Sequence, residues 1–174
     1  MIAVTVMRYS RACSINFATR CSISTIHSNL MEKDGKTVRL ISNGVELRYA
    51  TSGSAGVDIP YNDPDAQYNP ITIMPHEHRS LRTGVIAHLD FPYFGMLVGR
   101  SSLFAKGLVV HQGTIDCDYE GEIRVLMWNT SDLPHTIGKG DRIAQLIIMR
   151  YEIVKGARVS AVRRGSDGFG SSGR

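Results

Sequence analysis

Short runs of β-branched and aromatic residues, each closed by a turn cluster, constrain the fold of this chain most. Clusters such as 61–65 (YNDPD), 74–76 (MPH) and 138–140 (GKG) separate the runs, and such residues end strands. Many short alternating strands are typical of a sandwich, jelly roll or barrel. The sequence therefore predicts an all-β fold. We expect strands at 37–41, 46–50, 71–74, 85–89, 94–98, 108–111, 122–129 and 143–154, and one helical turn at 101–106.

Composition narrows the class of protein. The chain has 174 residues, of which 43% are hydrophobic and 21% charged, so one ordered domain with tails is expected. No apolar run approaches the roughly 18 residues that a membrane helix needs, and we expect no membrane partner. Three cysteines are too few and too scattered for a disulfide framework or a cysteine zinc site, which favours a reducing compartment.

The positive charge is concentrated at one end. The net charge is +4, and residues 1–31 carry Arg8, Arg11 and Arg20 without any acid, which leaves 17 basic and 16 acidic residues elsewhere. Nonspecific nucleic-acid binding needs several clustered phosphate contacts. We therefore expect no stable nucleic-acid binding, and phosphate chemistry would have to come from local sites.

The chain divides into three parts by composition. Residues 1–31, rich in Arg, Ser and Thr, have the composition of a mitochondrial transit peptide, and an unstructured extension or a true start at Met31 fits equally well. Residues 32–160 form the expected β domain. Residues 161–174 form a glycine-rich arm that cannot build a core and is expected to be flexible. We expect a cytoplasmic protein, or a mitochondrial one if residues 1–31 are a transit peptide.

Two segments combine small residues with a single charge. In 52–59 (SGSAGVDI), Asp58 sits among apolar neighbours and is either hydrogen-bonded structurally or orients the water shell of a metal; the structural interpretation is favoured. In 99–107 (GRSSLFAKG), Ser hydroxyls and backbone amides after a strand can hold phosphate oxygens, and Arg100 adds a forked donor. The alternative is an ordinary tight turn with a solvated arginine.

Three further segments carry candidate chemistry. In 113–121 (GTIDCDYEG), an extended strand would place Asp116 and Asp118 on one face, where one could act as a general base; alternatively, both are solvated in a polar hairpin. In 140–148 (GDRIAQLII), Gln145 lies within an apolar run and needs a hydrogen-bond partner, which could be a ligand phosphate. In 164–173 (RGSDGFGSSG), Arg, Phe and Ser on a glycine arm could close over a nucleotide.

In this order, the five segments closely resemble the five motifs of the trimeric dUTPase family (deoxyuridine triphosphate nucleotidohydrolases). The resemblance implies a jelly-roll-like β-barrel that forms a homotrimer, with three subunits contributing to each active site and the C-terminal arm exchanged as a lid. It implies Mg²⁺-assisted attack of water at the α-phosphate of dUTP, yielding dUMP and pyrophosphate. This reaction limits uracil in DNA and supplies dUMP for thymidylate synthesis.

The resemblance also implies roles for individual residues. Asp116 would activate the attacking water, Tyr119 would lie under the deoxyribose, and Asp58 would orient metal-bound water. The backbone of the hairpin around Val110 and Gly113 would read the uracil edge. The implied phosphate-binding residues are Arg100, Ser101, Ser102 and Gln145, and the implied lid residues are Arg164, Phe169, Gly170, Ser171 and Ser172.

Two alternatives stay open. The motif G-R-S-S-L at 99–103 resembles the corresponding motif of dCTP deaminases, which have the same fold. By alignment, however, Leu126 and Ala105 stand where those enzymes carry a Glu and an Arg. Deamination without a proton-shuttling carboxylate is hard to support. The other alternative is a nucleotide-responsive protein-binding module, because a fold alone does not exclude one.

Overall fold

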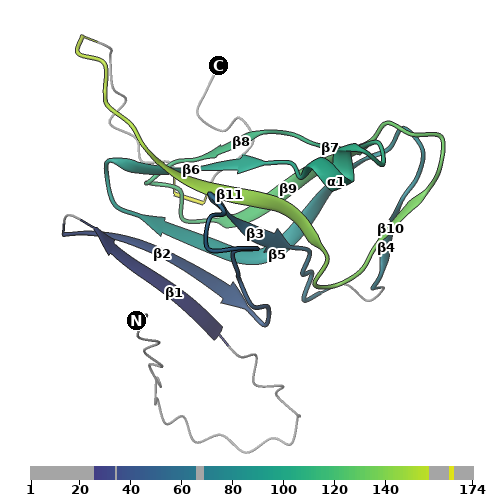
Figure 1. Ribbon diagram of the computed structural model, residues 1–174, viewed down its shortest axis with the longest axis horizontal. Helices are drawn as coiled ribbons and strands as arrows, with labels where there is room; N and C mark the ends of the chain where they lie inside the picture. Colours follow the sequence, from purple (N-terminus) through teal and green to yellow (C-terminus); the bar gives the residue numbers. More distant parts are fainter. Residues whose placement is uncertain (1–25, 34, 66–68, 157–164, 167–174) are drawn as a thin grey trace, which may run out of the picture.

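The structure, a computed structural model, describes residues 26–33, 35–65, 69–156 and 165–166. In these ranges the chain forms eleven strands and one helical turn, arranged as two antiparallel sheets and a two-stranded ribbon (Figure 1). The first sheet has the order β1 (Ile26–Lys33), β2 (Lys36–Asn43), β5 (His78–Leu89), β9 (Glu122–Asn129) and β7 (Leu108–Val110). The second has the order β3 (Gly56–Pro60), β11 (Arg142–Arg150), β6 (Tyr93–Val98) and β8 (Gly113–Ile115). The ribbon pairs β4 (Ile71–Ile73) with β10 (His135–Ile137), and α1 (Ser101–Phe104) follows β6.

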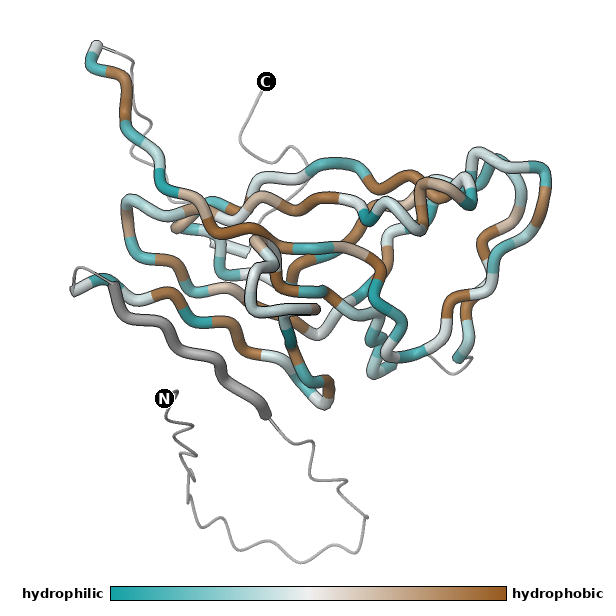
Figure 2. Tube along the Cα trace, viewed as in Figure 1, coloured by the Kyte–Doolittle hydropathy of each residue, from teal (hydrophilic) through white to brown (hydrophobic). Residues whose placement is uncertain are grey.

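One hydrophobic core joins the two sheets. Burial alternates along β5, β9 and β6, as expected for strands with one face on a core, and Figure 2 shows hydrophobic residues recurring along the strands of both sheets. Leu81 and Val125 from the first sheet and Leu97 and Leu146 from the second all belong to this core. The prediction of an all-β, jelly-roll-like fold is therefore confirmed.

Some strands differ from the expectation. Residues 46–50 form no strand and contribute one isolated bridge, Arg48 to Asp58. β3 was not expected, because all five of its residues are buried and it lacks the alternation that marks a half-exposed strand. β8 and β10 have three residues each and are too short to show a pattern, while β11 ends at Arg150 rather than at 154.

The first sheet begins within the segment that composition assigned to an N-terminal extension. β1 starts at Ile26 and pairs along its length with β2, from Ile26 opposite Asn43 to Lys33 opposite Lys36. The sheet thus starts six residues before the expected boundary at residue 32. The rest of that extension, residues 1–25, lies outside the described residues.

Within the described ranges, no helix has the length and apolarity to cross a bilayer.

Candidate active site

The second sheet carries a buried carboxylate, Asp58 on β3, which is 2% exposed. Its Oδ2 accepts a hydrogen bond from Arg142 Nη1 at 3.1 Å, and its Oδ1 accepts one from Gln145 Nε2 at 3.2 Å. Gln145 stands opposite Asp58 in the β11–β3 register. Gln145 was expected to need a hydrogen-bond partner. The structure supplies one within the chain itself, the carboxylate of Asp58.

A β-bulge explains how Arg142 and Gln145 reach the same carboxylate. Residues three apart on a regular strand point to opposite faces. The β11–β3 register shifts between Arg142 and Ala144, and a bulge of this kind redirects a side chain. Arg142 was missed from the sequence because the G-D-R triplet was interpreted only as a turn, and a bulge leaves no pattern that composition reveals.

Arg100 completes the cluster from the end of β6. Its Nε lies 3.4 Å from Asp58 Oδ1, and its Nη1 donates to the backbone oxygen of Arg142 at 3.0 Å. A guanidinium has five N–H donors, so these contacts with described residues leave donors for a ligand. The side chain is 20% exposed, and its contacts with Asp58 and with the Arg142 backbone orient the forked donor group. We call Asp58, Arg100, Arg142 and Gln145 the arginine–carboxylate cluster.

The arginine–carboxylate cluster borders a cavity of about 500 Å³. Asp58, Arg142 and Arg48 line it, with Glu46 and Pro60. Arg48 is paired with Glu46 at 2.6 Å on the exposed rim. Guanidinium groups suit planar recognition of phosphate oxygens, and the cavity wall holds two of them, Arg48 and Arg142, together with two carboxylates.

The segment after β6 places two serines at the same end of the sheet. Ser101 and Ser102 are exposed and open the one-turn helix α1, whose preceding residue Arg100 is extended (φ −100°, ψ 138°). A Cβ on Gly99 would lie 3.3 Å from Val110 Cβ. The small residue at position 99 thus lets this turn approach the segment that contains Val110.

The segment around Val110 and Gly113, expected to be a hairpin, instead links the two sheets, because β7 and β8 pair with different strands. Val110 ends β7 and pairs with Met127 of the first sheet, whereas Gly113 begins β8 and pairs with Leu97 of the second. Between them, the His111 amide donates to the Leu126 backbone oxygen at 2.9 Å. The backbone of this linking segment is therefore anchored to both sheets.

The third motif forms a turn rather than an extended strand. β8 ends at Ile115, and the Tyr119 amide donates to the Asp116 backbone oxygen at 3.1 Å. The expectation that Asp116 and Asp118 share one face of an extended strand is wrong, because the chain reverses here. The turn also replaces the regular alternation from which that expectation came.

Tyr119 lies across the end of this turn. Its hydroxyl donates to the Glu122 backbone oxygen at 3.0 Å. Cys117, beside Asp116, lies with Sγ 3.7 Å from the Tyr151 hydroxyl, and this contact together with burial raises the pKa of Tyr151 to about 12. Cys117 therefore contacts Tyr151, the residue that follows β11 of the second sheet.

Within one chain, the third motif does not meet the arginine–carboxylate cluster. Ile115, just before Asp116, pairs with Gly95 near the start of β6, whereas Arg100 follows the end of β6. Gly95 and Arg100 are five residues apart, which is roughly 17 Å along an extended chain at about 3.3 Å per residue. The structure thus brings Asp58, Arg100 and Gln145 together and leaves Asp116 and Tyr119 at the other end.

The C-terminal arm is described only at Gly165 and Ser166. Gly165 forms a parallel bridge with Tyr119, and its oxygen accepts the Glu120 amide at 2.9 Å. The arm therefore reaches the third motif of its own chain at this point. The expected lid residues, Arg164, Phe169, Gly170, Ser171 and Ser172, lie outside the described residues.

The described residues do not form a metal cage of their own. No three His, Cys, Asp or Glu side chains in the described ranges are grouped so that they could hold a metal ion. Both oxygens of Asp58 face nitrogen donors. This donor set fits a carboxylate that acts on a metal through water and not one that ligates it directly.

Known proteins resemble this chain in sequence and in fold. A sequence model of the dUTPase family matches residues 43–173. A deoxyuridine 5'-triphosphate nucleotidohydrolase of Alcanivorax borkumensis is 41% identical over 133 residues, which are 72% of this chain and 86% of that protein. A dUTPase structure from Streptococcus mutans superimposes with a TM-score of 0.57 at 26% identity, covering 64% of this chain and 90% of the other.

A more distant structure shares the fold. It is a mutant dUTPase from phage phi11 of S. aureus, described for its coordination of a structural Mg(II) ion, with a TM-score of 0.58 at 21% identity over 78% of this chain and 96% of that one. The family match covers β3 to β11 and all five motifs. The chain therefore belongs to the dUTPase family.

Proposed function

We propose that this chain performs the family reaction, hydrolysis of dUTP to dUMP and pyrophosphate, in a site whose two halves come from different copies of the chain. The observation that carries the proposal is the separation of the arginine–carboxylate cluster from Asp116 and Tyr119 along β6. One half holds the arginines that would bind phosphate, and its carboxylate, Asp58, is engaged by two of them. A second copy would supply the half that contains Asp116, as in a homotrimer with cyclic symmetry.

The phosphate end of the site is preorganised by Asp58. Its carboxylate holds Arg100 and Gln145 in place before substrate arrives, and groups fixed in advance stabilise charge more effectively than mobile ones. Arg100 would bind the triphosphate with its remaining donors, and Ser101 and Ser102 would add hydroxyls and amides. The Arg142 backbone oxygen would hold the Arg100 guanidinium, and Gln145 would hold the Asp58 carboxylate that pairs with it.

Magnesium would enter bound to the substrate as Mg–dUTP. When bound, the ion neutralises phosphate charge and helps to orient the triphosphate. Asp58 would act on its water shell, which agrees with the nitrogen donors around both carboxylate oxygens. Since phosphoryl transfer depends on positioning and charge neutralisation, the chain needs few groups that react covalently.

The other end of the site would supply the base and the selectivity. Asp116 would accept a proton from water as the water oxygen bonds to the α-phosphorus and the bond to the bridging oxygen breaks, releasing pyrophosphate. Tyr119 would lie against the deoxyribose and exclude a 2′-hydroxyl. The backbone at Val110 and Gly113 would read uracil, and a site built from fixed donors and acceptors rejects cytosine strongly.

The C-terminal arm would close over the bound nucleotide. Its bridge to Tyr119 at Gly165 supports a place for the arm beside the proposed sugar site. Phe169 would cover the base, and Arg164, Ser171 and Ser172 would contact the phosphates. An arm that closes only after substrate has bound excludes water from the site at the moment of reaction.

A product assay tests the proposed function. The purified chain is offered dUTP, dCTP, dTTP and UTP separately with Mg²⁺, and nucleotide products, pyrophosphate and ammonia are quantified. We expect dUMP and pyrophosphate from dUTP alone. Ammonia from dCTP would favour the deaminase alternative in spite of Leu126, and no turnover of any nucleotide would favour a binding module.

A further inference from the structure

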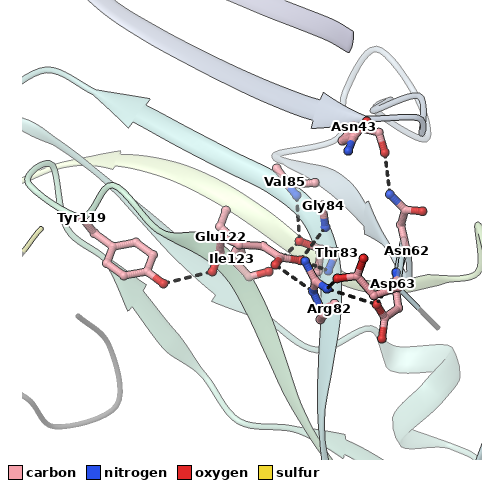
Figure 3. A network of polar contacts seen from close by, with 11 residues as sticks. Asn43, Asn62, Asp63, Arg82, Thr83, Gly84, Val85, Tyr119, Glu122 and Ile123 are labelled. Carbon is pink, nitrogen blue, oxygen red and sulfur yellow. Dashed lines mark hydrogen bonds and ion pairs between the residues drawn. The ribbon is translucent and has the colours of Figure 1, made fainter. Parts of the chain in front are cut away.

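We propose that Glu122 is a positioning residue for Tyr119 and thereby sets how strongly the site rejects ribonucleotides. The inference rests on the proposed function, because the place of Tyr119 against the deoxyribose is part of it. Glu122 was not singled out in the sequence, where it is the first residue of an ordinary strand. Its contacts, however, connect β9, an irregularity in β5 and the Tyr119 hydroxyl (Figure 3).

The Glu122 carboxylate caps backbone amides of the neighbouring strand. Its Oε1 accepts the amides of Thr83 at 3.0 Å and Gly84 at 2.8 Å, and its Oε2 accepts Arg82 Nε at 3.0 Å. The Glu122 side chain is 19% exposed, so few water molecules can replace these hydrogen bonds. Unpaired amides in such a place are costly, and the carboxylate is held by three donors at once.

The capped amides belong to a β-bulge in β5. Arg82 pairs with Arg124 and Ile86 with Glu122, so four steps along β5 match two along β9. Gly84 adopts a left-handed φ of +65°, and a Cβ there would lie 2.6 Å from Asn62 Nδ2. Glycine is thus required at the bulge, and Glu122 supplies the acceptors that the interrupted ladder lacks.

Further contacts hold the bulge in place. The buried Thr83 hydroxyl donates to the Ile123 backbone oxygen at 2.6 Å and accepts the Val85 amide at 3.1 Å. Arg82 also pairs with Asp63 at 3.3 Å and with Asp65. The carboxylate of Glu122 is therefore anchored to a rigid part of the first sheet.

The backbone of Glu122 transmits this anchoring to Tyr119. Its carbonyl oxygen accepts the Tyr119 hydroxyl at 3.0 Å, and the same residue is tied to β5 through its side chain. A Cβ at Gly121 would lie 2.5 Å from Tyr119 Oη and 2.7 Å from Cζ. The ring thus lies against Gly121 with its hydroxyl ending on the Glu122 carbonyl.

This arrangement has a consequence for specificity. Rejection of a 2′-hydroxyl by a flat ring depends on the ring staying in contact with the sugar, because a small displacement admits an extra oxygen. Without the carboxylate, two bulge amides lose their acceptor, and residue 122 keeps its backbone pairing with Ile86 but loses its side-chain contacts with Arg82, Thr83 and Gly84 of β5. The Tyr119 ring then has more freedom, and turnover of UTP rises relative to that of dUTP.

The test compares kcat/KM for dUTP and for UTP in Glu122→Ala, Tyr119→Phe and the double variant. We expect each single variant to lower the dUTP-to-UTP ratio about tenfold, the size of effect that one hydrogen bond carries. The double variant should lower it no further than the stronger single one, because both changes act through the same contact. Glu122→Gln, which keeps one oxygen for the two amides, should restore much of the ratio.

Glu77→Ala is the matched control. Glu77 also accepts a backbone amide, that of Met74 at 2.8 Å, and pairs with Arg79 Nε at 2.5 Å, but at the far end of β5. Its removal should change the free energy of unfolding without changing the dUTP-to-UTP ratio. This control separates a general loss of stability from a loss of ring placement.

Three outcomes would overturn the inference. One is an unchanged dUTP-to-UTP ratio in Tyr119→Phe. This variant loses a single hydroxyl and is expected to fold, so it keeps the test available if Glu122→Ala does not fold. Another is additivity of the two single effects in the double variant. A third is an equal fall in the ratio for Glu77→Ala. Absence of dUTP turnover by the unsubstituted chain would instead refute the proposed function.

Discussion

Replacing Asp58 with alanine should destabilise the fold and weaken phosphate binding together. The change removes a carboxylate that is 2% exposed and deletes its contacts with Arg100, Arg142 and Gln145. Breaking a fully buried pair by removing one partner costs about 3–5 kcal/mol. Arg142 is 48% exposed and recovers water contacts, so we expect a loss of about 2–3 kcal/mol in the free energy of unfolding, below the fully buried case.

Chemical denaturation at one fixed protein concentration measures this loss, since oligomers change apparent stability with concentration. Asp58→Asn keeps the shape and one acceptor oxygen, and it should lose less than Asp58→Ala. Asp90→Ala is the control, because Asp90 is an exposed residue whose carboxylate accepts the Thr37 amide at 2.9 Å. Its effect should stay within about 0.5 kcal/mol, as for most surface substitutions.

The same variants report on the site. Without Asp58, Arg100 loses the ion pair that orients its guanidinium, and KM for dUTP should rise in Asp58→Ala. A stability within about 0.5 kcal/mol of the unsubstituted chain would refute the reasoning, because it would mean that Asp58 does not hold the two arginines. An unchanged KM would show that Arg100 is oriented by other contacts.

Three further predictions follow from the structure. Gly84→Ala should lower the unfolding free energy by more than about 1 kcal/mol, because φ is +65° and the added Cβ would lie 2.6 Å from Asn62 Nδ2; a denaturation midpoint equal to that of the unsubstituted chain would contradict this. Asp116→Asn should abolish turnover while leaving dUTP binding by calorimetry nearly intact, and normal turnover would mean that another group is the base. Truncation after Ala161 should sharply reduce activity without changing the melting temperature, and full activity of the truncated chain would remove the arm from the mechanism.

The strands that the sequence predicted well are those with one face on the core. β6 and β9 alternate regularly and were expected within a residue of their bounds. β3 could not be found this way, because all of its residues are buried and it begins with Gly and ends with Pro. The segment 46–50 has the composition of a strand, but only Arg48 pairs, through its bridge to Asp58. Pairing partners, more than local preference, decide such cases.

The candidate site was predictable in part. Gln145 stood out as a polar residue in an apolar strand, and the structure gives it a partner in Asp58. Arg142 was hidden by the bulge at the start of β11. Glu122 contacts Thr83, 39 positions away in sequence, and no local pattern records a contact of that range. Side-chain pairs set by long-range register need the fold before they can be recognised.

The shared site is the central claim, and complementation between inactive variants tests it most directly. Arg100→Ala and Asp116→Asn chains, each inactive alone, are mixed in equal amounts, unfolded, refolded together and assayed with dUTP. If each site combines the cluster of one chain with Asp116 of another, the refolded mixture as a whole should regain roughly a quarter of the unsubstituted activity, because each of the two contributing chains has an even chance of carrying the intact half. A mixture as inactive as its components would contradict the account and place both halves of the site in one chain.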